Sequence, residues 1–258
     1  MSIKIELGVI KLMKRFTELV VAADFSENVW TKKDYFALLL IPLIFLISFI
    51  TQYFSARNIL PALIDTSLRL IMFISLIVVY GPMLRKHWSK FKLAWKQSVL
   101  LIVGGAITLQ ILISVVRSLL PTNNNIDTEI PPLIDPLTAS PEMFMLLFYI
   151  SLGPIVTALI EDTVFRYTLL GKIFHGGFVK KALILILNSI LFGLIHYFNF
   201  GSVIGTIPFM FAGLFLNIIY LWTRNIWHVL LIHTLNNGVL TFGALLFIVI
   251  LRLLGIET

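Results

Sequence analysis

Long apolar runs are the feature that most constrains how this chain folds. Stretches of about 20 residues, long enough to cross the ~30 Å hydrocarbon layer of a bilayer as a helix, recur along the sequence. Of its 258 residues, 59% are hydrophobic and 13% are charged, whereas an ordinary soluble domain carries about 25% charged residues. Strands of a membrane barrel would be shorter and would alternate apolar with polar residues. The sequence therefore predicts an all-α, polytopic transmembrane helical bundle.

We expect seven or eight spans. Before them, apolar and charged residues interleave in a pattern typical of an amphipathic helix on the membrane surface. The chain then divides into an amphipathic N-terminal segment (1–34), N-terminal spans with an external Pro-rich loop (35–142), and a C-terminal membrane core (143–258). Seven spans can be placed, near 35–54, 62–84, 98–120, 143–174, 179–199, 203–223 and 226–254, the last with a possible break at Gly238 or Gly243.

The basic residues occur in every second loop between these runs. By the positive-inside rule this pattern predicts a multi-pass protein of the cell membrane with a cytoplasmic N-terminus. Membrane topology thus explains the formal charge of +7, and we expect no nucleic-acid partner. The opposite, external side carries the segment Pro121–Glu142, which reads as a solvated connector, with a lid or a partner site as the alternative.

Ionisable residues inside a span cost about 2.5–3.5 kcal/mol each on insertion scales, so each is a candidate for function unless it pairs or reaches the interface. Three groups of polar residues remain after that test. They are Glu161 with Asp162 and Arg166, then His196, and then His233 with Asn236 and Asn237.

Helical geometry separates the two adjacent carboxylates. Asp162 and Arg166 are four residues apart and can form an ion pair that supports the fold, whereas Glu161 points about 100° away. Glu161 shares its face with Thr157 and Thr168 instead. A carboxylate without a cation in a low-dielectric setting suits general acid–base catalysis at neutral pH. The alternative is a structural carboxyl group hydrogen-bonded between helices.

The histidines lie on other spans. His196 shares a helix face with Phe192 and Asn188, and Gly193 allows a neighbouring helix to approach closely. His233 and Asn237 again share a face at a spacing of four residues. Each group alone is as compatible with interhelical packing as with a catalytic site.

Their depths in the membrane support a common site in part. If the chain turns at Gly176-Gly177, Glu161 lies 15 residues before the turn and His196 lies 19 after it. At 1.5 Å per residue they fall within about 6 Å of the same depth. His233 fits less well, at only about 12 Å from the turn at Asn225.

Taken in order, Glu161-Asp162-x-x-x-Arg166, Phe192-x-x-x-His196 and His233-x-x-x-Asn237 resemble the motifs of the CPBP family. This family contains the type II CAAX prenyl endopeptidases and related bacterial membrane proteins linked to bacteriocin processing and self-immunity. The resemblance covers about residues 145–240. The second acid is commonly glutamate in the family and is Asp162 here, a difference that concerns mainly the geometry towards Arg166.

The resemblance implies an intramembrane endopeptidase. Glu161 and His196 would activate the attacking water, His233 and Asn237 would stabilise the oxyanion, and Arg166 and Asp162 would support them. The family is usually classed as metalloproteases, so Glu161, His196 and His233 are the implied ligands if Zn²⁺ is bound. The chain has no cysteine and no His-Glu-x-x-His helix, and we favour water activated by glutamate without a metal.

The substrate implied is a hydrophobic or lipidated peptide that enters from the bilayer, in peptide or bacteriocin processing or in self-immunity. Two alternatives stay open. One is a membrane scaffold or immunity protein of the same fold without catalysis. The other is a proton-coupled transporter, which the absence of paired repeats with broken helices disfavours. The sequence carries no prediction of oligomeric state.

Overall fold

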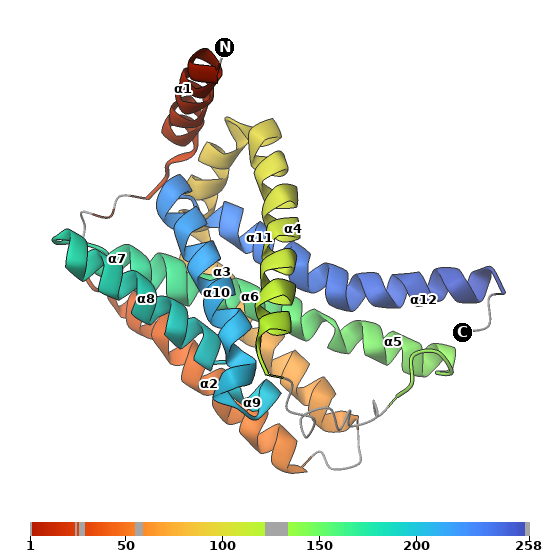
Figure 1. Ribbon diagram of the computed structural model, residues 1–258. Helices are drawn as coiled ribbons and strands as arrows, with labels where there is room; N and C mark the ends of the chain where they lie inside the picture. Colours follow the sequence, from red (N-terminus) through yellow and green to blue (C-terminus); the bar gives the residue numbers. More distant parts are fainter. Residues whose placement is uncertain (1, 24, 26–28, 55–58, 122–133, 256–258) are drawn as a thin grey trace.

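The computed structural model describes residues 2–23, 25, 29–54, 59–121 and 134–255, and these residues form helices with no strand (Figure 1). Six helical runs in the described residues are long and apolar enough to cross a membrane. The predicted all-α polytopic architecture is therefore confirmed. The six runs are α2 (Lys32–Phe54), α3 (Leu60–Lys92), α4 (Trp95–Leu119), the run Pro141–Ile173, α10 (Val203–Thr223) and the run Ile226–Leu253.

The fifth predicted span, residues 179–199, is shorter than expected. Helix α8 (Phe178–Leu194) has 17 residues, which is about 25 Å at 1.5 Å per residue and less than the ~30 Å needed to cross. The chain then turns at His196 into the short α9 (Tyr197–Phe200) and reaches α10 through Gly201, whose φ is 64°. His196 thus lies at the turn of the helical hairpin formed by α8 and α10.

Two of the spans change their helical type within the membrane. The run from Pro141 contains α5 (Pro141–Ile150), α6 (Leu152–Asp162), the π-helix η1 (Thr163–Leu170) and α7 (Gly171–Ile173). The last run contains α11 (Ile226–Gly238), the π-helix η2 (Val239–Gly243) and α12 (Ala244–Leu253). The break expected at Gly238 or Gly243 is a π-helical segment that ends at Gly243.

Side-chain caps and positive-φ residues set the turns. The side chains of Ser140, Ser202 and Asn225 accept hydrogen bonds from the backbone N–H groups at the starts of α5, α10 and α11, as is usual for these residue types at helix N-termini. Gly176, at φ 101°, makes the turn between α7 and α8, where the sequence predicted it. The external segment Pro121–Glu142 lies largely outside the described residues, but Glu142 belongs to the first turn of α5.

The N-terminal helix α1 (Ser2–Val20) projects from one end of the bundle (Figure 1). Its last turns pack Phe16 and Val20 against Ala94 and the partly buried Trp222. Helices α5 and α12 extend away from the bundle together (Figure 1), with the Arg252 guanidinium of α12 over the Phe144 ring of α5 at 4.8 Å. Phe148 of α5 also contacts the ring of Phe242 in η2 at 5.0 Å.

The tightest helix contact joins α8 to α10. A Cβ on Gly193 would lie 2.6 Å from the backbone nitrogen of Met210 and would also collide with that side chain. Beside it, Asn217 Nδ2 donates to Asn188 Oδ1 at 2.9 Å and to Ser189 Oγ at 3.0 Å. Gly193 therefore allows the close approach that the sequence predicted, and amide hydrogen bonds fix the pair.

We expect Gly193→Ala to destabilise the protein, because the backbone of α10 cannot move aside as a flexible side chain can. Overpacking of this kind costs about 1–3 kcal/mol, or a fall of several degrees in Tm for a chain of this length. The measurement is thermal unfolding in detergent. Gly104→Ala is the matched control, since a Cβ there meets nothing within 4 Å and its Tm should not fall.

Candidate functional site

A cavity of about 380 Å³ lies between α2, α3, α6 and the start of η2. Glu161 from α6, His196 from the end of α8 and Asn237 from α11 all line it. These three residues come from all three predicted motifs. The cavity is also bordered by polar residues of α2 and α3, which the sequence reasoning did not associate with the site.

Glu161 and Asp162 differ in surroundings as well as in direction. Glu161 is 6% exposed, whereas Asp162 is 0% exposed. Glu161 is in the cavity wall and, within the described residues, its carboxylate has no hydrogen bond and no ion pair. The separation of the two side chains by helical geometry leaves Glu161 open to whatever enters the cavity.

Asp162 holds a buried charge cluster behind the cavity. Its Oδ1 lies 2.9 Å from Arg166 Nη1, and both side chains are fully buried. The Arg166 guanidinium also lies over the Phe192 ring at 4.0 Å and donates to the Gly213 carbonyl. The expected Asp162–Arg166 ion pair is therefore present, and it fixes α6 and η1 against α8 and α10.

His233 contacts Asp162. Its Nδ1 is 3.2 Å from Asp162 Oδ2, and His233 is not among the residues that line the cavity. Asp162 thus contacts both Arg166 and His233. A role of His233 beside Glu161, or in stabilising an oxyanion, stays a prediction.

His196 and Asn237 supply polar atoms at the cavity. The Nε2 of His196 is buried and has no hydrogen-bond partner, while its ring stacks near Phe209 at 4.5 Å. Asn237 donates from Nδ2 to the carbonyl of Pro154 at 3.2 Å. An amide nitrogen carries two protons, so this bond leaves Asn237 one further donor.

Phe192 organises the space between these groups. Its ring lies 5.7 Å from the ring of His196 and 5.8 Å from that of His233, edge-on to both. With Arg166 over its face, Phe192 contacts three of the predicted functional side chains at once. The predicted pair Phe192-x-x-x-His196 therefore has a packing role as well as a helical one.

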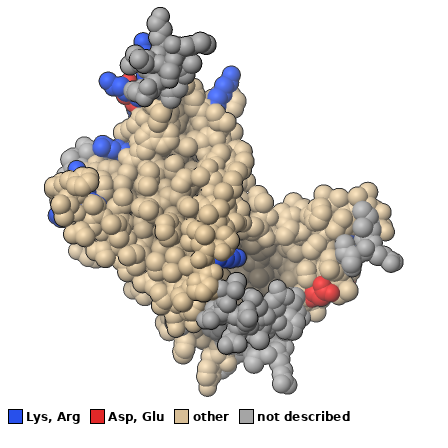
Figure 2. All heavy atoms as spheres, in the orientation of Figure 1, with Lys and Arg blue, Asp and Glu red and all other residues tan. Residues whose placement is uncertain are grey.

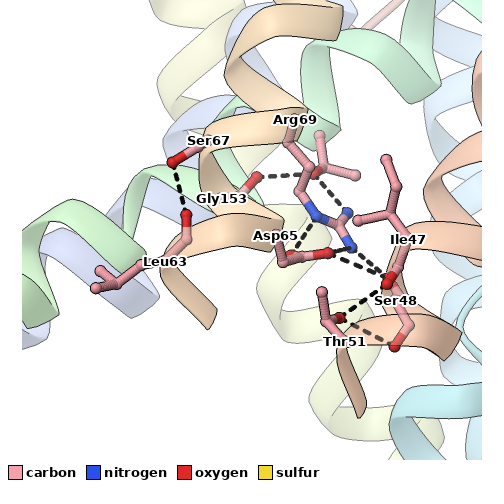
Figure 3. Close-up of polar contacts among 9 residues, drawn as sticks. Ile47, Ser48, Thr51, Leu63, Asp65, Ser67, Arg69 and Gly153 are labelled. Carbon is pink, nitrogen blue, oxygen red and sulfur yellow. Dashed lines mark hydrogen bonds and ion pairs between the residues drawn. The ribbon is translucent and has the colours of Figure 1, made fainter. Parts of the chain in front are cut away.

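Sequence reasoning missed the ion pair of Asp65 and Arg69, both of which line the cavity. Arg69 Nε is 2.6 Å from Asp65 Oδ2, and Arg69 also donates to Ser48 Oγ on α2 and Thr157 Oγ1 on α6 (Figure 3). The network joins three helices one turn before Glu161. Its signal was in the sequence, since two opposite charges four residues apart in a span satisfy the test applied to Asp162 and Arg166.

The π-helix η1 changes which residues share the face of Glu161. An uninterrupted α-helix would place Thr168 with Thr157 and Glu161. Instead Thr168 is fully buried, with its hydroxyl 3.3 Å from that of Tyr80. Only Thr157 remains beside Glu161, so the sequence expectation for Thr168 was wrong. Single π-helical turns often occur at functional sites.

The set Glu161, His196 and His233 does not fit a metal ion in this arrangement. Within the described residues, no three His, Asp or Glu side chains converge as metal ligands. The chemistry considered below therefore uses the side chains of the chain alone.

The comparison with known proteins agrees with the motifs. Residues 142–239 match the model of the family described as type II CAAX prenyl endopeptidase Rce1-like. No curated protein and no solved structure matches the chain. The matched segment contains Glu161, His196, His233 and Asn237, and leaves α2, α3 and α4 outside. Through this segment, less than half of the chain, the protein is similar to the type II CAAX prenyl endopeptidases.

Proposed function

We propose that the protein hydrolyses a peptide bond within the membrane, with Glu161 as the general base. The family is one of intramembrane CAAX-type endopeptidases. The observation that carries the proposal for this chain is the free Glu161 carboxylate in a membrane cavity that it shares with the unpartnered imidazole of His196. Two polar groups left without partners in a low-dielectric setting are costly unless they serve a ligand.

In this mechanism Glu161 takes a proton from water as the water oxygen bonds to the peptide carbonyl carbon. The oxyanion that forms accepts hydrogen bonds from the second N–H of Asn237 and from an N–H of His196. The intermediate then collapses, the C–N bond breaks, and Glu161 returns the proton to the departing amine. His233 acts behind the site, where it and Arg166 hold Asp162.

The substrate we infer is a hydrophobic or lipid-attached peptide that reaches the cavity from the bilayer. The cavity combines the polar groups above with apolar walls that include Ile41, Phe45 and Leu240. Processing or export of a secreted peptide such as a bacteriocin, or self-immunity to one, is the setting that we propose. We also propose that the protein lies in the cell membrane with its N-terminus in the cytoplasm, as the basic loops indicate.

Glu161→Gln and His196→Ala should each abolish most peptide cleavage while leaving expression and unfolding temperature close to those of the wild type. Loss of general acid–base catalysis typically costs about 10²–10⁴-fold in rate. The assay incubates purified protein with candidate peptides encoded near its gene, with and without chelator, and detects products by mass spectrometry.

The matched control is Glu142→Gln, because Glu142 is an exposed acid in the same helical run and does not line the cavity. It should cleave at the wild-type rate. If Glu161→Gln and His196→Ala both keep the wild-type cleavage or phenotype, the scaffold interpretation is favoured. If proteoliposomes show uptake driven by a pH gradient and no cleaved peptide, the transporter interpretation is favoured.

The two neighbouring acids should differ in what their loss does to stability. Asp162→Asn removes the partner of a fully buried Arg166, and leaving one charge of such a pair uncompensated costs about 3–5 kcal/mol. Thermal unfolding in detergent should therefore show a clear fall in Tm for Asp162→Asn and little change for Glu161→Gln. Equal effects of the two substitutions on Tm would contradict the division of roles.

The proposed orientation can be tested because the chain has no cysteine of its own. A single cysteine in place of Ala139 should react with an impermeant maleimide in intact cells. One in place of Ser89, in the basic last turns of α3, should react only after the membrane is opened. Labelling in the reverse pattern would show the opposite orientation.

A further inference from the structure

A second cavity, separate from the proposed active site, lies at the end of the bundle that carries the basic loops. It has a volume of about 160 Å³ and shares no lining residue with the larger cavity. We call it the basic cavity, and define it by Lys86, His87, Gly171, Lys172 and Tyr220. These residues come from α3, α7 and α10, which are distant in the sequence.

Tyr220 gives the clearest sign that the basic cavity takes a ligand. Its side chain is 0% exposed, and its hydroxyl has no hydrogen-bond partner. A buried hydroxyl without a partner destabilises the folded protein. Gly171 keeps the hydroxyl open, because a Cβ there would lie 3.4 Å from it.

The other polar groups of the basic cavity are donors too. His87 accepts the backbone N–H of Ile226 at Nδ1, at 3.0 Å, so the proton of its neutral ring is on Nε2. Lys86 adds an ammonium group that can only donate. Lys172 pairs with Asp34 at 3.5 Å and donates to the carbonyl of Val29. Among the described residues, two ammonium groups stand against one carboxylate, so this part of the site has a net positive charge and favours an anionic ligand.

The position of the basic cavity indicates which anion. Lys86, near the end of α3, and Lys172, in α7, belong to the basic stretches of the chain, and Figure 2 shows much of the blue surface near α1 and the α7–α8 turn. Basic pockets between membrane helices on the cytoplasmic side are typical sites for lipid headgroups. We propose that the basic cavity binds the phosphate group of an anionic phospholipid, with Tyr220, His87 and Lys86 as its main donors.

The test uses the purified full chain in detergent and three probes: dioctanoyl phosphatidylglycerol, dioctanoyl phosphatidylcholine and inorganic phosphate. Each is titrated while the unfolding temperature is followed. We expect phosphatidylglycerol to raise Tm in a saturable way, and the other two to do so much less. Tyr220→Phe and Lys86→Gln should each weaken the binding of phosphatidylglycerol about tenfold, which is the effect of losing one hydrogen bond to a charged group.

Lys90→Gln is the matched control, since Lys90 is an exposed lysine of the same helix that does not line the basic cavity. It should bind like the wild type. Tyr220→Phe has a second expected signature: without lipid its Tm should equal or exceed that of the wild type, because it removes an unpaired hydroxyl. A purely structural tyrosine would lower Tm and leave the lipid response intact.

The proposal is overturned if Tyr220→Phe and Lys86→Gln bind phosphatidylglycerol as tightly as Lys90→Gln, or if no probe raises Tm. If inorganic phosphate raises Tm as much as phosphatidylglycerol does, the proposal of a lipid ligand is overturned and free phosphate is the ligand. The result is independent of catalysis, because Glu161→Gln should bind the lipid like the wild type whether or not it cleaves peptides.

Discussion

The cost of burying charge inside a membrane protein is the constraint on which this structure depends. The clearest case is Asp162, which is fully buried and contacts both Arg166 and His233. Each of these side chains would be expensive alone, and together they neutralise one another across η1 and α11. Phe192 from α8 covers the guanidinium, so residues of α8, of α11 and of the run Pro141–Ile173 meet in a single cluster. The helices around the cavity are held at fixed positions by this cluster.

Because the cluster binds Asp162, the neighbouring Glu161 can stay without a hydrogen bond or an ion pair. Glu161 precedes Asp162 in the sequence, yet the turn of the helix directs it into the cavity rather than into the ion pair. A cation in direct contact would hold its carboxylate and compete with water. Two adjacent acids thus have different surroundings, and the proposed reaction gives them different roles, as paired carboxylates often have.

Features that follow from local spacing could be predicted from the sequence. The length of the apolar runs predicted the spans, the four-residue spacing predicted the Asp162–Arg166 pair, and Gly193 predicted a close helix contact. What could not be predicted depends on tertiary structure. Neither the π-helix that moves Thr168 to Tyr80 nor the depth at which α11 begins has a signal in periodicity. The contact of His233 Nδ1 with Asp162 Oδ2 was not predicted, because the sequence does not give the position and rotation of α11 relative to α6.

The spacing of Asp65 and Arg69 was visible in the sequence, but the pair was not associated with the site. Their position shows how the site is assembled. They lie on α3, outside the segment 142–239 that matches the family, yet they line the same cavity as Glu161. Arg69 reaches Thr157, which is one helical turn from Glu161, and Ser48 on α2. The matched segment supplies the acid, the imidazoles and the amide, while the N-terminal spans supply the opposite wall. In the proposed reaction a peptide lies between the two walls. We therefore infer that the N-terminal spans determine which peptide the cavity accepts, and that chains sharing the three motifs but differing in α2 and α3 differ in substrate.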